Sequence, residues 1–515
     1  MTTPVTPDSS EAPTPAPVTP DSPAAVTPDT PVPVTQDSPA PVTPDTPAAG
    51  TRASRAAGAE AAPAPAPAVP AVPLGSLASD SPASVPVQAP AQVPPGGCPF
   101  AASAAAGELG ELPVIHGPEF SADPHATYDK LRATAPIVPV EIAEGMYGYL
   151  TTTYRAALHL LRNTPDKFAK DPRHWVALRT GQVPPGTPSA AMMEPRDNAL
   201  WMDGMPHTRL RKSITDTLDL IDTHALVATV TRIADTLIDA MAPRAEFDLV
   251  ADFSDPLPMQ VLIELFGCPP DLGRRIILAI GRLFDAGADA AEASAEVATA
   301  CLELTRLKRA EPGNDATSWL LTHPAQLTDV EMIQQILLVI GAATTPSSNL
   351  IANALLLMID DERFSGSVYE GVHSVAEAMD QVLWEDPPLA NYSPLYARRA
   401  ETYEGVRLEP GVPILVSFAA ANSDPALNGA THRRAGNRAH LAFSAGVHGC
   451  PAPDLAGIIT ETAVERVLDR LPDLRLACDR KDLTRRPGTF HSGWTALPVV
   501  QPAVAPLAAP HPGVH

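Results

Sequence analysis

The sequence predicts a mainly α-helical protein: one large domain with a small β-sheet region, preceded by a disordered, proline-rich tail. Residues 1–97 hold 24 of the 60 prolines and no Phe, Tyr or Trp. Residues 98–501 hold the aromatic side chains and the long apolar segments, most of which repeat with helical spacing. These observations favour a single folded domain over several.

The tail is predicted to be disordered because it cannot bury enough apolar surface to offset the ~1–2 kcal/mol per residue that backbone ordering costs. A short Val-Thr-Pro-Asp unit recurs from Val5 to Thr46, and residues 51–97 continue as an Ala/Pro linker. This composition is typical of an extended spacer, or of a flexible docking arm. Residues 502–515 are expected to form a shorter flexible tail.

The charge balance disfavours two classes of partner. The chain has 59 acidic and 36 basic residues, a net charge of −23. General affinity for nucleic acid or for an anionic membrane is therefore not expected. No basic segment followed by an apolar run opens the chain, and no stretch approaches ~18 consecutive apolar residues. We expect a soluble cytoplasmic protein.

Capping signals place the main helices. Thr328 and Glu331 form a capping-box pattern that predicts a helix from Asp329 to about Asp360, apolar on all sides and therefore central. A second box, Ser374 and Glu377, predicts a helix that stops before Asp386. The apolar run 412–418 predicts a strand, and Asp454 to Leu471 predicts a further helix.

The last of these helices gives one cysteine a special position. The five cysteines are scattered and contain no CxxC pair, which argues against a disulfide framework or a Cys-based zinc site. Cys450 directly precedes a helix N-terminus, where free N–H groups favour a thiolate. Gly446 lacks a Cβ and would let the loop approach a flat partner, Phe443 could cover its underside, and His448 could donate to an anion. Cys268, Cys301 and Cys478 are instead expected to be small buried hydrophobic residues.

The segment from His440 to Cys450 resembles the haem-binding loop of the cytochrome P-450 monooxygenases, in the soluble actinobacterial style. Further segments resemble this family in the right order over nearly all of residues 98–500. They are Met205–Arg211 for the C helix, Asn349–Ile351 for the central I helix, Asp386–Pro388 after the K helix, and Ala420–Pro425 before the meander. The resemblance implies a single P-450 type domain over residues 98–501.

The resemblance also implies a cofactor and its ligands. Cys450 would be the axial thiolate of haem b, with Phe443 and Gly446 in the loop beside it. The haem carboxylates would bind His207, Arg211, Arg399 and His448, with Arg398 adjacent to the third of these.

The implied partners are a small hydrophobic organic substrate, a ferredoxin and a ferredoxin reductase. The basic segments 209–212 and 432–438 could form the docking patch for ferredoxin, or could be two unrelated solvated loops.

The first departure from the family lies in the K helix. Gln381 and Trp384 stand where the family carries a Glu-x-x-Arg pair, so that salt bridge cannot form. The sequence resembles a minority actinobacterial subgroup with Gln-x-x-Trp at this place. Gln381 could still form a hydrogen bond, and Trp384 could stack on Arg433, Arg434 or Arg438 of the meander.

The second departure lies in the central helix, where the family has an acid followed by threonine. One register puts Ala343 and Thr344 at these places; a register without a gap puts Thr345 and Pro346 there. Neither retains a carboxylate. Pro346 is expected to kink or open the helix. Protons would pass through Thr344, Thr345, Ser347 or water, or these hydroxyls simply pack in the core.

Three functions follow from these observations. The first is a haem-thiolate monooxygenase that inserts one atom of O₂ into an organic substrate, with electrons from NAD(P)H through ferredoxin. The second is a haem-binding protein with weak or no oxygenase activity, a ligand sensor or a member of a complex. The third is a scaffold whose proline-rich tail is the functional part.

Overall fold

A computed structural model of the chain describes residues 112–183, 187–284, 290–361, 364, 374–427 and 436–507. The tail predicted over residues 1–97 and the end of the predicted C-terminal tail, residues 508–515, lie outside the described residues. Val504 N donates to Ala242 O at 3.1 Å and Leu507 N to Asp239 Oδ1 at 3.1 Å. The first part of the segment expected to be flexible is therefore held against a helix.

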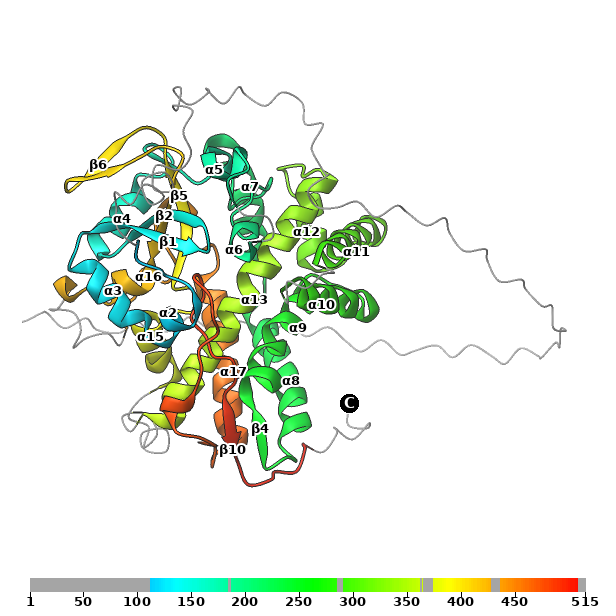
Figure 1. The fold of residues 1–515 in the computed structure, drawn as a ribbon. Coiled ribbons are helices and arrows are strands. Elements are labelled where there is room, and N and C mark those ends of the chain that lie inside the picture. Colours follow the sequence, from blue (N-terminus) through cyan, green and yellow to red (C-terminus); the bar gives the residue numbers. More distant parts are fainter. Residues whose placement is uncertain are drawn as a thin grey trace, which may run out of the picture. The chain divides into compact units, whose positions relative to one another are not determined.

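Helices make up most of the described chain, as predicted (Figure 1). The α-helices are α2 (Gly117–Ala122), α3 (Pro124–Arg132), α4 (Tyr154–Arg162), α5 (Val176–Arg179), α6 (Pro188–Ala191), α7 (Gly204–Leu218), α8 (Thr223–Met241), α9 (Pro256–Leu265), α10 (Pro270–Phe284), α11 (Ala290–Ala310), α12 (Ala316–Thr322), α13 (Asp329–Asp360), α15 (Val375–Glu385), α16 (Phe418–Asn422) and α17 (Pro453–Arg470). The shorter helical turns are η2 (Pro172–His174), the π-helical η3 (Val250–Ser254), η4 (Pro425–Leu427), η6 (Gly446–His448) and η7 (Arg480–Asp482).

The described strands form a five-stranded sheet in the order β1-β2-β8-β5-β3, a three-stranded sheet in the order β4-β10-β9, and the hairpin β6-β7. Their bounds are β1 (Ile137–Ala143), β2 (Met146–Thr151), β3 (Phe168–Ala169), β4 (Glu246–Asp248), β5 (Asn391–Ala397), β6 (Glu401–Tyr403), β7 (Val406–Leu408), β8 (Pro413–Ser417), β9 (Arg475–Leu476) and β10 (Pro498–Val500). In the larger sheet, Leu150 of β2 pairs with Val138 in antiparallel and with Leu415 in parallel register. The strand predicted over residues 412–418 is thus β8, a buried interior strand.

Helix α13 crosses the middle of the fold, with the larger sheet on one side and α10 and α11 on the other (Figure 1). It begins at the predicted capping box, in which Thr328 Oγ1 accepts from Glu331 N at 3.2 Å and the Glu331 carboxylate accepts from Thr328 N at 2.9 Å. Most of its apolar side chains are buried, Ile336 and Leu355 completely. This is the one described helix that is long and apolar enough to cross a membrane, and 56% of its apolar window is buried inside the protein, as in a core helix.

The apolar packing of α13 changes along its length. Up to Ile340 it packs in a cluster with α9 to α12, and from Leu350 it packs in a second cluster with α8, α15 and α17. Residues 341–349 belong to neither cluster. The helix therefore has a stretch in its middle that leaves the apolar core and is available for a site.

Two further helices lie close to the positions predicted from the sequence. Helix α15 begins after the predicted capping box of Ser374 and Glu377 and ends at Glu385, before Asp386. Helix α17 packs in the same apolar cluster as α15 and is joined to α8 by ion pairs: Arg466 Nε lies 2.6 Å from Asp235 Oδ1, and Arg470 Nη2 lies 2.6 Å from Asp239 Oδ1. These pairs fix the helix that follows Cys450.

Candidate functional site

The loop that leads to Cys450 is folded back on itself by its own backbone. Cys450 N donates to Phe443 O at 2.8 Å, and Gly449 N donates to Gly446 O at 3.0 Å. Ser444 and Gly446 have φ angles of +62° and +74°, in the left-handed region. These turns place the Cys450 side chain at a fixed point between the loop and α17.

Gly446 is required at this point by the neighbouring helix α4. A Cβ at Gly446 would lie 2.5 Å from the carbonyl oxygen of Leu161, in the last turn of α4, which is closer than real Cβ atoms come. The positive φ angle independently favours glycine. The missing Cβ thus lets the loop pack on protein backbone, whereas the sequence suggested that it makes room for a flat partner.

Cys450 lies ahead of a helix N-terminus, as predicted. Its Sγ accepts from Ala452 N at 3.4 Å, and α17 begins at Pro453. Burial raises the pKa of the Cys450 thiol, although the Ala452 N–H and the Arg211 charge both act to lower it. The net direction is opposite to what the helix terminus alone would give. A thiolate here needs a further positive charge, which a metal ion supplies when it binds sulfur.

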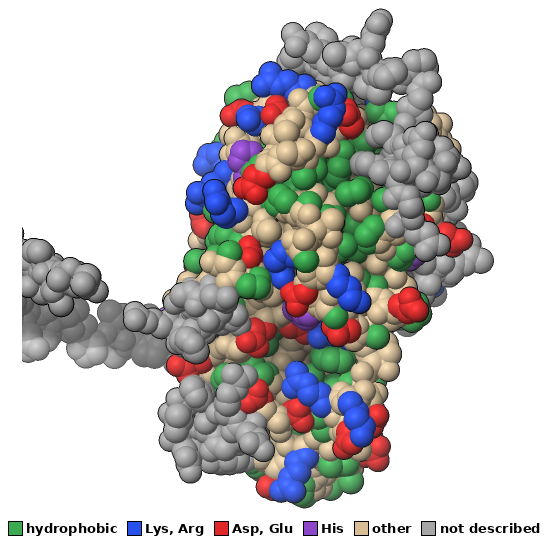
Figure 2. All heavy atoms as spheres, turned by 60° about the vertical axis from the view of Figure 1, so that its left-hand side comes forward, with side chains coloured by type: hydrophobic (Ala, Val, Ile, Leu, Met, Phe, Trp, Pro, Cys, Tyr) green, Lys and Arg blue, Asp and Glu red, His purple; other side chains and the backbone are tan. Residues whose placement is uncertain are grey.

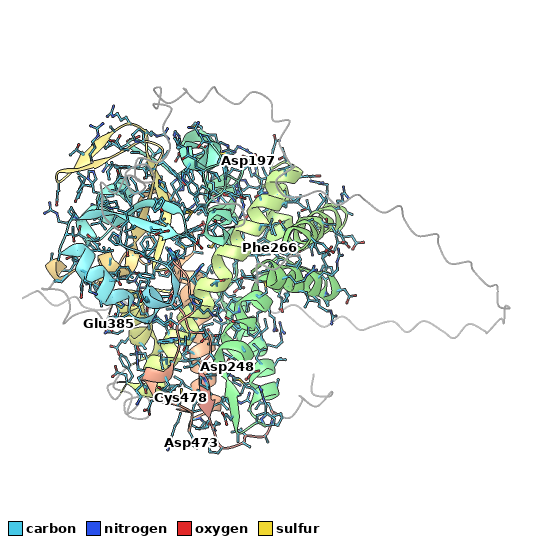
Figure 3. The ribbon with its side chains drawn as sticks, viewed as in Figure 1. Asp197, Asp248, Phe266, Glu385, Asp473 and Cys478 are labelled. Carbon is cyan, nitrogen blue, oxygen red and sulfur yellow. The ribbon has the colours of Figure 1, made fainter. Side chains whose placement is uncertain are left out.

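Two of the other cysteines belong to the apolar core, as expected. Cys301 is completely buried in the cluster that includes Phe266, which Figure 3 labels. Burial raises the pKa of Cys268, beside the same cluster, to about 12. Cys478, also labelled in Figure 3, follows β9. In the described ranges, no three His, Cys, Asp or Glu side chains gather where they could hold a metal ion.

The two histidines predicted to bind the haem carboxylates lie close together near this loop, although they are 241 positions apart in the sequence. His207 lies in the first turns of α7 and His448 in η6, and their ring centroids are 4.0 Å apart. His207 is 6% exposed, and its Nε2 has no hydrogen-bond partner in the structure. His448 Nε2 lies 3.6 Å from Asp203 Oδ1, beyond hydrogen-bond distance. An unbonded buried imidazole nitrogen of this kind suits an anionic acceptor.

Arg211, one turn after His207 on α7, belongs to the same cluster. Its Nε donates to Thr215 Oγ1 at 3.3 Å, and its charge acts on both His207 and Cys450. Burial lowers the pKa of Arg211, and burial together with the charges of His448 and Arg211 lowers the pKa of His207 to about 4. Burial and neighbouring positive charges therefore disfavour the cationic forms of Arg211 and His207.

Lys170 and Asp203 belong to this cluster as well, although no sequence pattern indicated them. Lys170 is completely buried, its backbone N donates to both carboxylate oxygens of Asp203 at 3.1 and 3.0 Å, and its Nζ lies 5.1 Å from the Trp201 ring and 5.7 Å from the Tyr392 ring. Burial lowers the pKa of Lys170 to about 7, while Asp203 acts in the opposite direction. The Lys170 charge also lowers the pKa of His448, which places this cation in the same electrostatic site.

Arg399, the predicted third ligand for a haem carboxylate, lies apart from the cluster. Its Nε donates to Glu401 Oε1 at 3.0 Å, and its side chain is 79% exposed. Its neighbour Arg398 points the other way: Nη2 lies 3.3 Å from Asp203 Oδ2 and Nε donates to Pro165 O at 2.6 Å. Successive residues after β5 face opposite sides, so only one of the two arginines can reach the cluster.

Neutral hydrogen bonds connect α15 to the segment before the Cys450 loop, where the family's salt bridge is absent. Trp384 Nε1 donates to Asn437 O at 2.8 Å, and the indole meets the His440 ring edge-on with centroids 5.8 Å apart. Asn422 bridges the same two elements: its Nδ2 donates to Leu383 O at 2.9 Å and its Oδ1 accepts from Leu441 N at 2.8 Å.

The prediction that Arg438 could stack on Trp384 is wrong. Arg438 is 78% exposed and pairs with Asp454 at 3.3 Å, so it does not stack on the indole. Arg433 and Arg434 lie outside the described residues. Within those residues, the Gln381 side chain has no hydrogen bond, so the suggestion that it replaces the family's glutamate in this way finds no support.

The middle of α13 presents an open face. Gly341 and Ala342 are exposed although they lie midway along a core helix, and no atom lies within 4 Å of where a Cβ of Gly341 would be. Thr345 and Pro346 are half-buried. This open face is part of the stretch, residues 341–349, that belongs to neither apolar cluster.

The predicted hydroxyl residues on α13 differ in their bonding. Thr344 Oγ1 donates to Ile340 O at 2.6 Å, so this hydroxyl is used inside the helix. Ser347 is 6% exposed. Pro346 does not end the helix, which continues to Asp360, although it removes the N–H that would otherwise bond to Ala342 O. The helix is thus continuous through Pro346, and the kink expected there stays a prediction.

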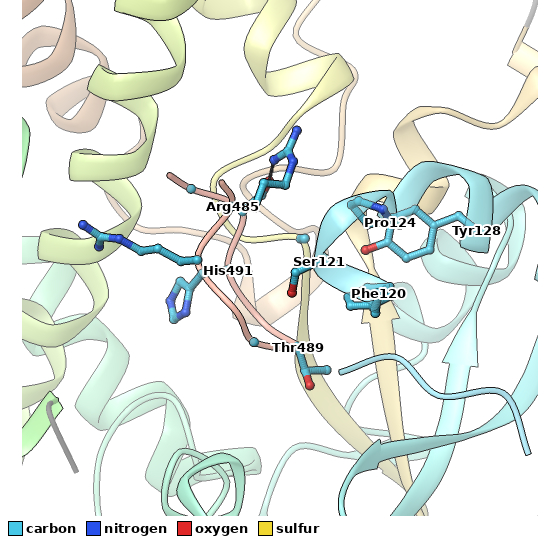
Figure 4. Close-up of a pocket in the computed structure, with 12 residues that line it drawn as sticks. Phe120, Ser121, Pro124, Tyr128, Arg485, Thr489 and His491 are labelled. Carbon is cyan, nitrogen blue, oxygen red and sulfur yellow. Dashed lines mark hydrogen bonds between the residues drawn. The ribbon is translucent and has the colours of Figure 1, made fainter. Parts of the chain in front are cut away.

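A separate small pocket lies between helices α2 and α3 and the C-terminal segment (Figure 4). Phe120 and Tyr128 line it from the helices, and Arg485, Thr489 and His491 from the C-terminal segment. Burial and the charge of Arg486 lower the pKa of His491 to about 4, so this imidazole is neutral at pH 7. None of the site residues predicted from the sequence lines this pocket.

Comparison with known proteins identifies the fold and the family. No model of a known protein family matches the chain. Its sequence is 31% identical over 405 residues to the cytochrome P450 monooxygenase PikC of Streptomyces venezuelae, covering 76% of the chain and 93% of that protein. It is 28% identical over 402 residues to 6-deoxyerythronolide B hydroxylase of Saccharopolyspora erythraea, covering 75% and 98%.

Solved structures give the same result. The structure resembles CYP154C4 from Streptomyces sp. W2061, with a TM-score of 0.68 and 26% identity over 75% of the chain and 97% of that protein. It resembles CYP154A1 from Streptomyces coelicolor A3(2) with a TM-score of 0.66 and 27% identity over 76% and 100%. The chain belongs to the cytochrome P450 family of haem-thiolate monooxygenases, whose cofactor is haem b.

Proposed function

We propose that the protein inserts one atom of O₂ into a small hydrophobic organic substrate, in the cytoplasm, with electrons from NAD(P)H relayed by a ferredoxin reductase and a ferredoxin. The balanced reaction takes substrate, O₂, two electrons and two protons to a hydroxylated product and water. The observation that carries this proposal is the position of Cys450, which the loop backbone holds beside α17 and beside the cations of α7.

The cation cluster fits the two carboxylates of haem. Burial lowers the pKa of His207, Arg211, His448 and Lys170, and Asp203 is the carboxylate near them. The unbonded Nε2 of His207 adds a free donor. We propose that these four side chains bind the haem carboxylates through hydrogen bonds, which are charge-assisted where the side chain is protonated, and that Arg398 positions Asp203.

Cys450 would bind the haem iron, and Phe443 and Gly446 would shape the loop around it. Phe443 acts through its backbone carbonyl, which holds Cys450 N, and Gly446 acts through its close approach to α4. When bound, a haem with a thiolate ligand supplies the activation of O₂.

The open face of α13 would then be the substrate side of the site. Gly341 and Ala342 leave room beside the helix. Pro346 has no N–H, so it donates no helical hydrogen bond to Ala342 O. Thr345, half-buried on this face, and Ser347 are proposed to relay protons, whereas the Thr344 hydroxyl already donates to Ile340 O.

We propose that a ferredoxin docks on the face nearest Cys450 because electrons must reach the haem that this residue would bind, and not because that face is strongly basic. In the described part of the chain, the basic residues expected there are largely neutralised: Lys212 Nζ lies 2.7 Å from Asp216, and Arg209 pairs with Glu331. Figure 2 shows basic and acidic side chains interspersed on the face that it presents. Residues 432–435 of the second basic segment lie outside the described residues.

A second candidate function is haem binding with weak or no oxygenase activity. The absence of a carboxylate from the middle of α13 and the replacement of the Glu-x-x-Arg pair by Gln381 and Trp384 favour it. Such a protein would act as a ligand sensor or as a member of a complex.

One experiment separates these functions. Purified protein is loaded with haem, reduced and treated with CO, and its absorption spectrum is recorded. The proposal expects the red-shifted band of thiolate-ligated haem, followed by product formation from a compound that shifts the spectrum on titration. A normal band without product from any binding compound would favour the second function, and the absence of the band would contradict both.

A further inference from the structure

A carboxylate from another part of the chain contacts α13 close to its open face. Ser348 Oγ donates a hydrogen bond to Asp255 Oδ1, and Asp255 lies 93 residues earlier, between η3 and α9. Both η3 and α9 pack against α13. The middle of α13 has no carboxylate of its own, but a neighbouring element thus supplies one to its surface.

Ser348 lies on the same face as the open stretch of the helix. Gly341, Thr345 and Ser348 are spaced by four and three residues, which puts their side chains in one row along an α-helix. Gly341 is exposed, Thr345 is half-buried and Ser348 is 3% exposed. The row therefore leads from open space to a buried hydroxyl that is bonded to a carboxylate.

Asp255 is both held in place and accessible to water. Its Oδ2 accepts from Arg486 Nη2 at 2.5 Å, and Arg486 Nε donates to Trp494 O at 2.8 Å. The Asp255 side chain is 39% exposed. One carboxylate oxygen is thus fixed by an arginine and the other by Ser348, while water can reach the group to exchange protons with it.

We propose that Asp255 and Ser348 deliver protons to the Thr345 face of α13, in place of an acid within the helix. This inference rests on the proposed function, because each turnover consumes two protons together with two electrons and one O₂. Protonated Asp255 gives its proton to Ser348 Oγ, and Ser348 releases its own hydroxyl proton toward Thr345. A hydroxyl group can do both because it has one donor and two acceptor positions. Asp255 then regains a proton from water.

The experiment uses the full chain loaded with haem, with a ferredoxin, its reductase and NADPH. Reduction of the iron under CO consumes no protons, so D255N should form the CO band at a rate within about twofold of wild type. NADPH oxidation in air does consume protons, and loss of a positioned donor typically costs about 10²–10⁴-fold. We expect D255N to oxidise NADPH at least about tenfold more slowly, with a larger solvent deuterium isotope effect, and D255E to restore the rate.

A matched control separates proton delivery from a structural role. R486Q breaks the same ion pair but leaves the carboxylate, so D255N and R486Q should lower the melting temperature of the haem-free protein to a similar extent, while R486Q oxidises NADPH within about twofold of wild type. S348A keeps the Asp255–Arg486 pair and should slow NADPH oxidation as D255N does.

Two outcomes would overturn the inference: unchanged NADPH oxidation and isotope effect in S348A and D255N, or equal slowing in R486Q and D255N. If D255N loses haem, the rate of NADPH oxidation by S348A alone decides whether the proton-delivery proposal holds. The absence of a CO band in wild type would instead contradict the proposed function itself.

Discussion

The Cys450 loop and the middle of α13 obtain their polar groups in different ways. In the loop, the hydrogen bonds that orient Cys450 come from residues within seven positions of it, Phe443 and Ala452. On α13, the carboxylate at Ser348 comes from 93 residues away, and the arginine that holds this carboxylate comes from the C-terminal segment. The proposed metal ligand is thus positioned locally, whereas the proposed proton donor depends on the packing of three separate elements.

The largest effect is expected from removing the sulfur of the loop. Cys450→Ala should abolish the red-shifted CO band, because no other described cysteine lies in the loop. Cys301→Ala, a substitution in the apolar core, should keep the band and lower stability only by the cost of a small cavity. Spectra of the reduced, CO-treated proteins measure both. An intact band in Cys450→Ala would contradict the assignment of the ligand.

The pKa of Lys170 and its substitution test whether the cluster of cations beside the Cys450 loop binds the haem carboxylates. In haem-free protein its pKa is about 7, against 10.5 for an ordinary lysine, so the unfolded chain binds more protons between these values. The free energy of unfolding should therefore rise from pH 7 to about 10.5, by at most about 4–5 kcal/mol at 1.36 kcal/mol per pKa unit.

Lys170→Met should remove this rise, and after haem loading it should release haem to apomyoglobin several-fold faster than wild type. Denaturant unfolding at a series of pH values and haem-transfer rates are the measurements. If haem transfer is unchanged in the variant, Lys170 does not bind the haem carboxylates, whatever the pH profile shows.

Gly446 tests how tightly the loop packs on α4. Gly446→Ala should destabilise the protein by about 2–4 kcal/mol, because a left-handed backbone costs a Cβ-bearing residue roughly 1–2 kcal/mol and the contact with Leu161 O adds overpacking. Gly457→Ala, inside α17 with open space around it, should instead stabilise by about 0.5–1 kcal/mol. Thermal unfolding of both variants gives the comparison, and a neutral Gly446→Ala would show that the loop can move away from α4.

These examples show which parts of the site a sequence can predict. The Cys450 loop, the capping boxes of α13 and α15 and the strand β8 depend on neighbouring residues, and each was predicted close to its observed bounds. The role proposed for His207 followed only from the family resemblance, whereas the position of His448 in the loop also indicated a donor to an anion.

Partners joined by tertiary packing could not be predicted. Lys170 and Asp203, Trp384 and Asn437, and Ser348 and Asp255 are 33, 53 and 93 residues apart, and no local pattern links the members of these pairs. Arg398 and Arg399 are adjacent in sequence, so only the direction of the backbone after β5 decides which of them faces the cluster.

The smallest destabilisation is expected from Trp384→Phe, at the place where the family's salt bridge has been replaced by neutral contacts. Trp384→Phe keeps an aromatic ring against His440 but removes the N–H that bonds to Asn437 O, so the free energy of unfolding should fall by about 1 kcal/mol. Trp384→Ala also removes the packing of a buried indole and should cost about 3–5 kcal/mol. Denaturant unfolding and haem-transfer rates of the two variants separate the two contributions.

Haem retention should depend little on the indole N–H. Because Asn422 independently ties Leu383 to Leu441, Trp384→Phe should retain haem nearly as well as wild type. Rapid haem loss from Trp384→Phe would show that the single indole hydrogen bond, rather than the packing around it, replaces the missing salt bridge.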